Sequence, residues 1–340
     1  MQDCKTAGHK DNTMINWGII GCGNVTEVKS GPAFSKVPGS RLLAVMRRNR
    51  LLAEDYAKRH NVPKVYSDAH QLINDNEIDA VYVATPPGSH AAYAIDTLKA
   101  GKPVYIEKPM AINYEECEKI NEASAKYGVP VFVAYYRRAL PGFLKVKEMI
   151  ENGKIGKILF FQLQLFKPAS DDEKSGRLPW RVDPALSGGG HFFDLASHQL
   201  DYFDYLFGPV QKMKSMVRNY GGLYKAEDFL TAELEYPGGI TGIGTWSFSV
   251  SRDSYRDIIE IIGDKGSIRF STFSFENIVV TTSEGTTEMV NERPEHVQYN
   301  LIDKIVQTLE GKGESPSTGI TAARTSWVMD VIVEEYYGKK

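Results

Sequence analysis

The chain has 340 residues, of which 42% are hydrophobic and 24% are charged, values typical of a globular protein of about two domains. Its formal net charge of −3 provides no global basic field, which argues against nucleic acid or an anionic membrane surface as a partner. No apolar run approaches the roughly 18 to 20 residues that a membrane helix needs, so we expect no membrane segment.

The first 13 residues are polar and lack the apolar core of a secretory signal. Because Met14 directly precedes the first predicted strand, we expect residues 1–13 to be a disordered extension. Three widely spaced cysteines, Cys4, Cys22 and Cys117, form neither a CxxC pair nor a disulfide framework. A reducing, cytoplasmic location fits this cysteine pattern best.

From Met14 onward, short apolar runs alternate with helix-like stretches. The predicted strands are 15–20, 41–46, 79–85, 102–107 and 129–136. The predicted helices between them are 25–37, 51–60, 69–74, 90–100 and 114–127. Nearly continuous hydrophobic strands are typical of a parallel sheet buried on both faces. The alternation therefore predicts an α/β fold with a doubly wound Rossmann domain over residues 14–136.

The pattern changes after residue 136. A predicted helix at 143–152 precedes a long predicted strand at 157–166, and helical spacing returns within 187–208. Alternating segments with glycine and proline turns follow within 210–220, 229–250, 257–271 and 277–290, and two helices, 296–310 and 322–337, close the chain. The stretch "YPGGI" is a hairpin signal. We therefore expect residues 137–340 to form an α+β domain with a large, mainly antiparallel sheet.

The first predicted strand ends in "GCGNVT", a glycine turn that opens a helix. Gly21 would permit the tight turn, and Gly23 would let a pyrophosphate approach the backbone at the helix N-terminus. Thr26 stands where the dinucleotide fingerprint has its third small residue. Two glycines before a helix often serve turn geometry alone, but the position of this turn in the first βα unit predicts a dinucleotide site.

The end of the second predicted strand indicates which dinucleotide is bound. NAD-specific folds carry an Asp or Glu about 20 residues after the glycine loop, which binds the ribose 2′-hydroxyl. Arg47 and Arg48 stand there in this chain, and an arginine can pair with a 2′-phosphate. The two arginines could also be solvated residues at a strand end. Because no carboxylate is present to repel a phosphate, the sequence favours NADP(H) over NAD(H).

The fifth predicted strand ends at Glu107, Lys108 and Pro109. Ligands of open α/β sheets bind beyond the carboxyl ends of the strands, so this position favours a functional lysine over a solvated one. A lysine close to a nicotinamide could have its pKa lowered enough for proton transfer. The ring of Pro109 constrains the chain here, and a cis peptide bond is one way in which it can do so.

Asp194 and His198 share one face of the predicted helix after "SGGG", because residues at i and i+4 are neighbours on a helix. Histidine exchanges protons near neutral pH. Two other interpretations stay open: a buried histidine satisfied by Asp194 or Asp201, and a zinc site of His191, Asp194 and His198. The zinc site lacks a cysteine or a further histidine cluster to complete it, so we expect no metal.

Together these segments resemble the Gfo/Idh/MocA family of NAD(P)-dependent oxidoreductases over nearly the whole chain from about residue 14. The family includes glucose–fructose oxidoreductase, inositol dehydrogenase and 1,5-anhydrofructose reductase. The segments that carry the resemblance are "GIIGCGNV", "VATPPGSHAAYAIDTLKAGKPVYIEKPM", "YYRRALPGFLKVKEMIENGKIGKI" and "PWRVDPALSGGGHFFDLASHQLDYF". Their ordered combination is more specific than any one of them.

The resemblance implies that Lys108 is the catalytic lysine and that Asp194 and His198 are the substrate-side acid/base and orienting pair. It also implies contacts with the cofactor. The pyrophosphate would be held by Gly21, Gly23, Asn24 and Val25, and the two riboses would lie near Thr85, Pro86, Pro87 and His90. The nicotinamide ribose would also meet Glu107 and Lys108, and a loop with Trp180 and Arg181 would reach across to the cofactor. Arg47 departs from the acid of NAD-using members. His191 stands where many members have an apolar or small residue, which leaves the polarity of the substrate pocket open.

The implied reaction is hydride transfer between the nicotinamide and a hydroxyl or carbonyl carbon of a sugar, polyol or derivative, with His198, aided by Lys108, moving the hydroxyl proton. Two alternatives are a non-catalytic NADP-sensing regulatory protein and a glycosidase that uses nicotinamide transiently. Further candidates to face the substrate are Tyr135, Tyr136, Arg137, Trp180 and His191, although aromatic residues more often serve packing. In relatives the antiparallel sheet commonly forms the oligomer interface, so we expect a homodimer or homotetramer whose second domain also binds substrate.

Overall fold

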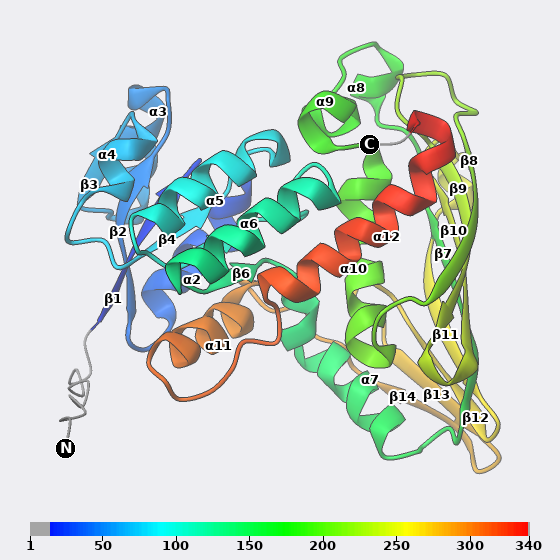
Figure 1. Ribbon diagram of the computed structural model, residues 1–340. Helices are drawn as coiled ribbons and strands as arrows, with labels where there is room; N and C mark the ends of the chain where they lie inside the picture. The colour runs from blue at the N-terminus through cyan, green and yellow to red at the C-terminus, as the bar shows by residue number, and fades with distance from the viewer. Residues whose placement is uncertain (1–13, 339–340) are drawn as a thin grey trace.

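The computed structural model describes residues 14–338 and contains two sheets with helices packed on and between them (Figure 1). The predicted extension at residues 1–13, with Cys4, lies outside the described residues. No helix within 14–338 is long and apolar enough to cross a membrane. The predicted fold class, a Rossmann unit followed by an α+β unit with a mainly antiparallel sheet, is confirmed.

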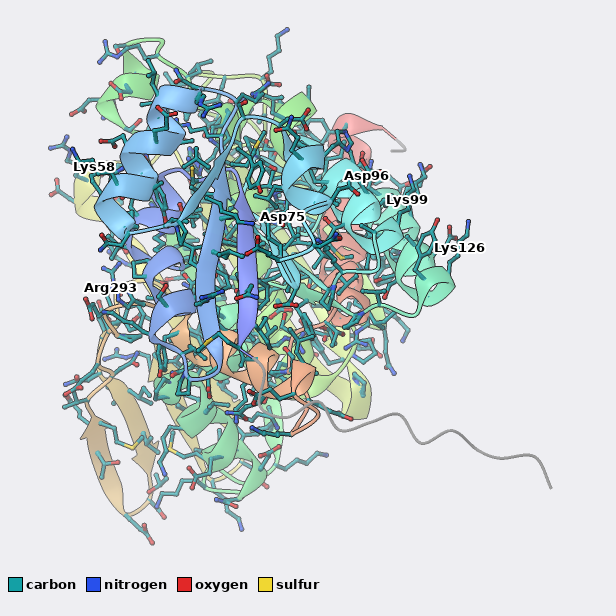
Figure 2. The ribbon with its side chains drawn as sticks, turned by 90° about the vertical axis from the view of Figure 1, so that its left-hand side faces the viewer. Lys58, Asp75, Asp96, Lys99, Lys126 and Arg293 are labelled. Atoms are coloured by element: carbon teal, nitrogen blue, oxygen red, sulfur yellow. The ribbon has the colours of Figure 1, made fainter. Side chains whose placement is uncertain are left out.

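Six parallel strands form the first sheet, in the order β3-β2-β1-β4-β5-β6. The strands are β1 (Ile15–Ile20), β2 (Ser40–Met46), β3 (Lys64–Tyr66), β4 (Ala80–Val83), β5 (Val104–Ile106) and β6 (Val131–Val133). The helices are α1 (Asn24–Val28), α2 (Gly31–Lys36), α3 (Arg50–His60), α4 (Ala69–Ile73), α5 (His90–Lys99) and α6 (Tyr114–Tyr127), with a 3₁₀ turn η1 (Pro87–Ser89). Every residue of β4, β5 and β6 is buried, because helices cover both faces of the sheet. Charged side chains such as Lys99 and Lys126 project outward from α5 and α6 (Figure 2).

Two features of this unit differ from the sequence-based prediction. Strand β3 was not predicted, since three residues are too few to show a periodic pattern. The single predicted helix 25–37 is instead α1 and α2, interrupted at Lys29 and Ser30. Pro32 has no N–H to donate to the carbonyl of Val28, so a continuous helix would lose a hydrogen bond there.

The second sheet has eight strands in the order β14-β13-β12-β11-β7-β10-β9-β8, and its pairs are antiparallel except for β7 with β10. The strands are β7 (Ile158–Phe166), β8 (Lys212–Arg218), β9 (Phe229–Tyr236), β10 (Ile240–Ser247), β11 (Arg256–Gly263), β12 (Gly266–Phe270), β13 (Ile278–Thr282) and β14 (Gly285–Met289). The hairpin predicted at "YPGGI" joins β9 to β10 through the 3₁₀ turn η4 (Pro237–Gly239).

The remaining helices lie on the side of this sheet that faces the Rossmann unit (Figure 1). They are α7 (Pro141–Glu151), α8 (Asp171–Lys174), α9 (Pro184–Ser187), α10 (His191–Phe207), α11 (Tyr299–Leu309) and α12 (Gly319–Tyr337), with the 3₁₀ turns η2 (Tyr136–Ala139), η3 (Trp180–Val182) and η5 (Arg252–Ser254). Helix α12 contacts α6 of the first unit as well as α10 and β8 of the second. The end of the chain thus joins the two units, while the domain boundary at 136/137 stays a prediction.

A buried ion-pair network fastens η2 to α10 and α12. The guanidinium of Arg138, 3% exposed, donates to both carboxylate oxygens of Asp201 at 2.9 Å and to Asp204 at 2.9 Å. Arg324 of α12 also donates to Asp204, with two bonds of 2.7 Å. Asp201 therefore has its own partner and, among residues 14–338, forms no hydrogen bond to His198, which removes Asp201 as the partner of a buried histidine.

Candidate functional site

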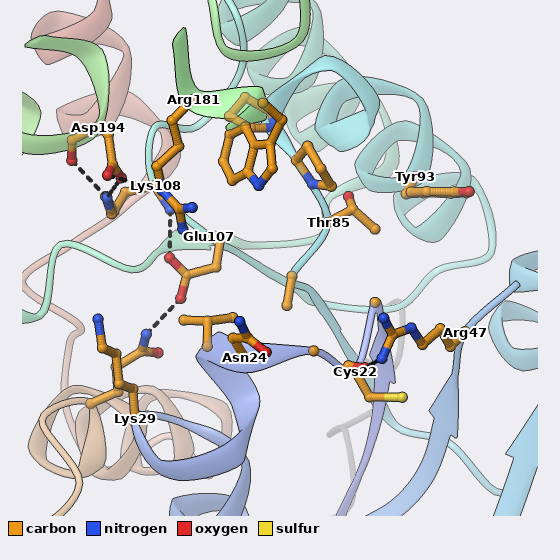
Figure 3. Close-up of a pocket in the computed structure, with 18 of the residues that line it drawn as sticks. Cys22, Asn24, Lys29, Arg47, Thr85, Tyr93, Glu107, Lys108, Arg181 and Asp194 are labelled. Carbon is orange, nitrogen blue, oxygen red and sulfur yellow. Dashed lines mark hydrogen bonds and ion pairs between the residues drawn. The ribbon is translucent and has the colours of Figure 1, made fainter. Parts of the chain in front are cut away.

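A cavity of about 740 Å³ opens where the strand order of the parallel sheet reverses, at the carboxyl ends of β1 and β4 (Figure 3). The sequence-predicted residues that line it are Gly21, Gly23, Asn24, Val25, Arg47, Arg48, Thr85, Pro86, Pro87, Glu107, Lys108, Trp180, Arg181, Asp194 and His198. The glycine loop, the end of β5, the η3 loop and helix α10 thus meet in one space, although they are up to 177 positions apart in the sequence.

His90 is the one predicted cofactor residue that does not line this cavity. Its ring is fully buried, with Nε2 2.6 Å from the carbonyl oxygen of Thr85 and Nδ1 3.0 Å from that of Pro109. The ring of His90 therefore faces two backbone carbonyls and not the cavity, and this burial argues against its predicted direct contact with the cofactor. Its side chain ties the loop after β4 to the loop after β5, where the Lys108–Pro109 peptide bond is cis.

The glycine loop has room for a bound pyrophosphate beside Gly23 but not beside Gly21. At Gly21 φ is +92°, and a Cβ would lie 2.8 Å from Thr85 Cγ2 and 3.0 Å from the backbone of Ala84. At Gly23 a Cβ would meet only the Gly21 carbonyl oxygen, at 3.8 Å, because the loop faces open space. Gly21 is therefore needed for the fold of the turn, and Gly23 leaves room for a ligand at the N-terminus of α1.

These two glycines predict different outcomes for the same substitution. Gly21→Ala should lower the thermal midpoint of unfolding, because alanine is strained at this φ and collides with Thr85. Gly23→Ala should unfold at the wild-type temperature but raise the Kd for a nicotinamide dinucleotide by about tenfold or more, since its methyl group occupies the phosphate space. Thermal unfolding and fluorescence titration with both reduced dinucleotides measure the two effects. Equal dinucleotide affinity in wild type and Gly23→Ala would contradict this assignment of the loop.

Thr26, which stands at the position of the third glycine, caps the first turn of α1 with its side chain. Its buried hydroxyl accepts from the Gly23 N–H at 3.1 Å and donates to the Gly23 carbonyl at 2.8 Å. Tyr56 of α3 donates to the Thr26 carbonyl at 2.8 Å. The side chain thus closes the first turn of α1 without entering the cavity.

Arg47 and Arg48 follow the end of β2 and are exposed, and Arg47 lies at the opposite side of the cavity from Asp194. Arg47 Nη1 donates to the Cys22 carbonyl at 3.4 Å, which directs the guanidinium along the glycine loop (Figure 3). Within residues 14–338, neither arginine forms an ion pair with a carboxylate. Both charges are therefore available to an anionic ligand.

Glu107 is a buried carboxylate whose partners come from three directions. It accepts from Tyr82 at 2.5 Å, from Gln298 Nε2 at 2.6 Å and from the Lys108 N–H at 3.2 Å. Tyr105 in turn donates to Gln298 at 2.8 Å. Glu107 is thus held by neutral donors, and the ammonium of Lys108 pairs with a different carboxylate.

Lys108 and Asp194 form the central ion pair of the cavity. Lys108 Nζ donates to Asp194 Oδ1 at 2.5 Å and to its backbone carbonyl at 2.7 Å, and Arg181 Nε donates to Oδ2 at 3.1 Å. Burial acts to raise the pKa of Asp194, but the charges of Lys108 and Arg181 outweigh it and hold the pKa below its ordinary value. Asp194 is therefore a stable anion that orients the ammonium of Lys108.

His198 lies deeper in the same cavity, 3% exposed, with its ring 5.1 Å from that of Tyr136. Among residues 14–338, its buried Nδ1 has no hydrogen-bond partner. Burial, reinforced by the charges of Arg137 and Lys108, holds the pKa of His198 well below its ordinary value. The imidazole is therefore neutral at physiological pH and can accept a proton.

The lowered pKa of His198 has a consequence for stability. The unfolded chain binds a proton at this residue below a pH of about 6.5, whereas the folded chain does not. The free energy of unfolding should therefore fall with pH from about 6.5 downward, by up to about 1.4 kcal/mol per pH unit for this group. Urea unfolding of wild type and His198→Phe over this range measures the difference. Identical slopes for the two proteins would contradict it.

The structure does not assemble the alternative zinc site. His191 Nε2 lies 2.6 Å from Glu173, whereas Asp194 pairs with Lys108. Across residues 14–338, no three His, Cys, Asp or Glu side chains are placed to hold a metal ion. His191, with its buried partner, also does not line the cavity.

Of the other aromatic and basic candidates for the pocket, Tyr136 and Trp180 line the cavity, whereas Tyr135 and Arg137 are buried behind its wall. The cavity also contains residues that the sequence did not indicate, among them Lys29, Asn49, Tyr93, Phe273 and Gln298. Phe273 and Gln298 come from irregular segments after β12 and before α11. No local pattern could have identified them.

Comparison with known proteins places both units in one family. A model described as an oxidoreductase family with an NAD-binding Rossmann fold matches residues 15–135, and a model of the GFO/IDH/MocA C-terminal domain matches residues 143–269. An oxidoreductase, P35, from Formosa agariphila is 39% identical over 93% of this chain and 98% of its own length. A myo-inositol 2-dehydrogenase from Thermotoga maritima is 29% identical over 79% of this chain and 78% of its own.

Solved structures share the fold. An oxidoreductase from Thermotoga maritima superposes with a TM-score of 0.82 at 27% identity, covering 94% of this chain and 95% of its own. A levoglucosan dehydrogenase in complex with NADH and L-sorbose superposes with a TM-score of 0.86 at 22% identity, covering 96% of this chain and 98% of its own.

Proposed function

The chain belongs to the Gfo/Idh/MocA family of NAD-binding oxidoreductases, and from that premise we propose that it transfers a hydride between NADP(H) and a hydroxyl or carbonyl carbon of a sugar or polyol. The observation that carries the proposal is the convergence of Lys108, Asp194 and His198 in the cavity that begins at the glycine loop. Relatives named as dehydrogenases of myo-inositol and levoglucosan support a polyhydroxy substrate.

The side chains divide the proton chemistry between them. A lysine ammonium has three N–H groups, and Asp194 takes two from Lys108, which leaves one for a substrate oxygen. Neutral His198 can then remove the hydroxyl proton at Nε2, which requires the ring's own proton to lie on Nδ1. The nicotinamide, when bound, supplies the hydride donor or acceptor. In the direction of reduction, the same two residues return the proton.

The preference for NADP(H) rests on Arg47 and Arg48, whose charges have no carboxylate partner within the described part of the chain. Arg47→Ser should raise the Kd for NADPH by about tenfold to 100-fold and change the Kd for NADH far less, because it removes a charge-assisted hydrogen bond to the 2′-phosphate. Arg50→Ser is the matched control, since Arg50 is held by Glu54 at 2.8 Å and lies outside the cavity. Equal losses for both dinucleotides would contradict the assignment.

A panel of sugars, polyols and keto-sugars, both neutral and anionic, assayed with NAD(H) and NADP(H) through the absorbance of the reduced nicotinamide, tests the reaction. We expect net consumption of NADP(H) with at least one of them. Turnover without net consumption would instead indicate a glycosidase that uses nicotinamide transiently. Cofactor binding without any turnover would indicate an NADP-sensing protein, which the retention of Lys108 and His198 in one cavity argues against.

The homodimer or homotetramer is also part of the proposal. In Figure 1 no helix covers the outer face of the large sheet, and apolar residues on it are partly exposed: Phe160 by 37%, Met216 by 39% and Ile243 by 50%. Such a face is typical of an interface between copies of a chain. Light scattering on the purified protein measures the mass.

A further inference from the structure

Two cations near the substrate end of the cavity, Lys29, which is exposed in its lining, and Arg137, which is buried behind its wall, have no carboxylate partner within residues 14–338. The other two, Lys108 and Arg181, share Asp194. A hydroxyl-only substrate needs no such excess of positive charge, so the two unpaired cations call for an explanation.

Lys29 lies on the substrate side of the glycine loop. It follows the last residue of α1, roughly 7 Å along the helix axis from the end that faces a pyrophosphate. The backbone N–H of Gln298 donates to the Lys29 carbonyl at 3.2 Å, so this position is fixed beside the Glu107 network. In Figure 3 the ammonium of Lys29 lies on the side of the cavity toward Asp194, away from Arg47. Lys29 is thus better placed for the substrate than for the cofactor phosphates.

Arg137 is a buried charge behind the cavity wall, 2% exposed. Its Nε and Nη2 donate to the Thr272 carbonyl at 3.1 and 2.9 Å, while Nη1 is buried without a hydrogen-bond partner in the described part of the chain. The guanidinium lies 4.6 Å from the ring centre of Phe273 and 5.0 Å from that of Tyr136, both of which line the cavity. A charge with so little water around it extends its field across these rings into the cavity.

The nearby carboxylates are engaged elsewhere. Asp194 is held by two cations, and Glu107 accepts from Tyr82 and Gln298. Asp257 accepts the backbone N–H groups of Thr272, Phe273 and Ser274 at 2.7 to 3.0 Å. None of the three forms an ion pair with Lys29 or Arg137.

We infer that the substrate is a polyhydroxy compound that carries an oxyanion, namely a carboxylate, sulfate ester or phosphate ester, and that Lys29 selects for it. The inference rests on the proposed hydride transfer and names the class of its substrate. An ammonium at the cavity wall gives an oxyanion a charge-assisted hydrogen bond, and the field of Arg137 adds attraction without contact.

Matched pairs of substrates test this inference: glucose with glucuronate, galactose with galacturonate, and glucose with its 6-sulfate and 6-phosphate, each with NADP and with NAD. We expect kcat/KM for at least one anionic member to exceed that of its neutral partner by tenfold or more and to fall as salt is added. The arms with carboxylate, sulfate and phosphate distinguish the three oxyanions.

Lys29→Met should lower the ratio of anionic to neutral kcat/KM about tenfold or more, while Lys29→Arg should restore most of it. Lys58→Met is the matched control, because this lysine projects from α3 on the outer surface (Figure 2) and should leave the ratio unchanged. Neutral substrates that react as fast as their anionic partners would overturn the inference but not the proposed function, and so would a ratio that Lys29→Met does not change. Failure of every pair with both cofactors would overturn the proposed function and the inference with it.

Discussion

Lys108→Met is expected to lower kcat by roughly 10²- to 10⁴-fold on whichever substrate the panel identifies, the range that positioned proton-transfer groups typically contribute. Methionine keeps much of the length of the side chain but removes the N–H that we propose is donated to the substrate oxygen. Asp194 retains Arg181 as a partner at 3.1 Å, so the cavity keeps its shape. The Kd for NADPH should change far less than kcat, which separates chemistry from cofactor binding.

His198→Ala is expected to cause a loss of similar size, and the double variant Lys108→Ala, His198→Ala should fall little further. Groups that act as one proton-transfer unit give strongly non-additive losses. Steady-state kinetics and fluorescence titration of NADPH measure the two quantities, with Lys58→Met as the control for loss of a lysine outside the cavity. A double variant that turns over at the wild-type rate would refute the assignment of both residues.

The second large effect should come from Arg138, which does not touch the cavity. Its guanidinium is 3% exposed and neutralises Asp201 while sharing Asp204 with Arg324. Arg138→Met should lower the free energy of unfolding by about 3 to 5 kcal/mol, because it leaves Asp201 as a buried carboxylate without a cation. The packing of η2 against α10, the helix that carries His198, should loosen as a result.

Arg324→Met provides the comparison for this experiment. Its side chain is 39% exposed, and its removal leaves Asp204 paired with Arg138, so we expect a loss of about 1 kcal/mol. Urea unfolding of the two variants measures the difference. If Arg324→Met destabilises the protein as much as Arg138→Met, the buried ion pair of Arg138 with Asp201 is not what holds η2 against α10.

Local sequence was sufficient to predict most of the fold. The apolar runs of the first unit are long and buried on both faces, so their pattern stands out from the helices between them. The hairpin at "YPGGI" and the helix after "SGGG" were predicted because turn residues and helical spacing are local signals. Strand β3 and the break between α1 and α2 were missed, since three residues show no period and a single proline does not fix where a helix divides.

In the candidate site, too, the residues in local motifs were predicted and the residues brought in by tertiary packing were not. Residues in motifs were predicted, because a glycine turn, a strand end and an i, i+4 helical pair carry their chemistry in their spacing. His90 belongs to such a motif but lies behind the wall, since its two ring nitrogens face backbone carbonyls and not the cavity. Phe273 and Gln298 belong to no motif and reach the cavity only through the packing of distant segments.

By itself, then, the sequence determined the two-unit architecture and the glycine loop, and it singled out Lys108, Asp194 and His198 as candidate chemical groups, because each of these features depends on residues close together in the chain. Only the tertiary structure decided how the charged groups are paired: Lys108 with Asp194, Asp201 with Arg138, and Lys29 and Arg137 with no carboxylate of residues 14–338. Charge pairing is a property of distance in space, and burial decides its strength, so neither can be derived from spacing along the chain.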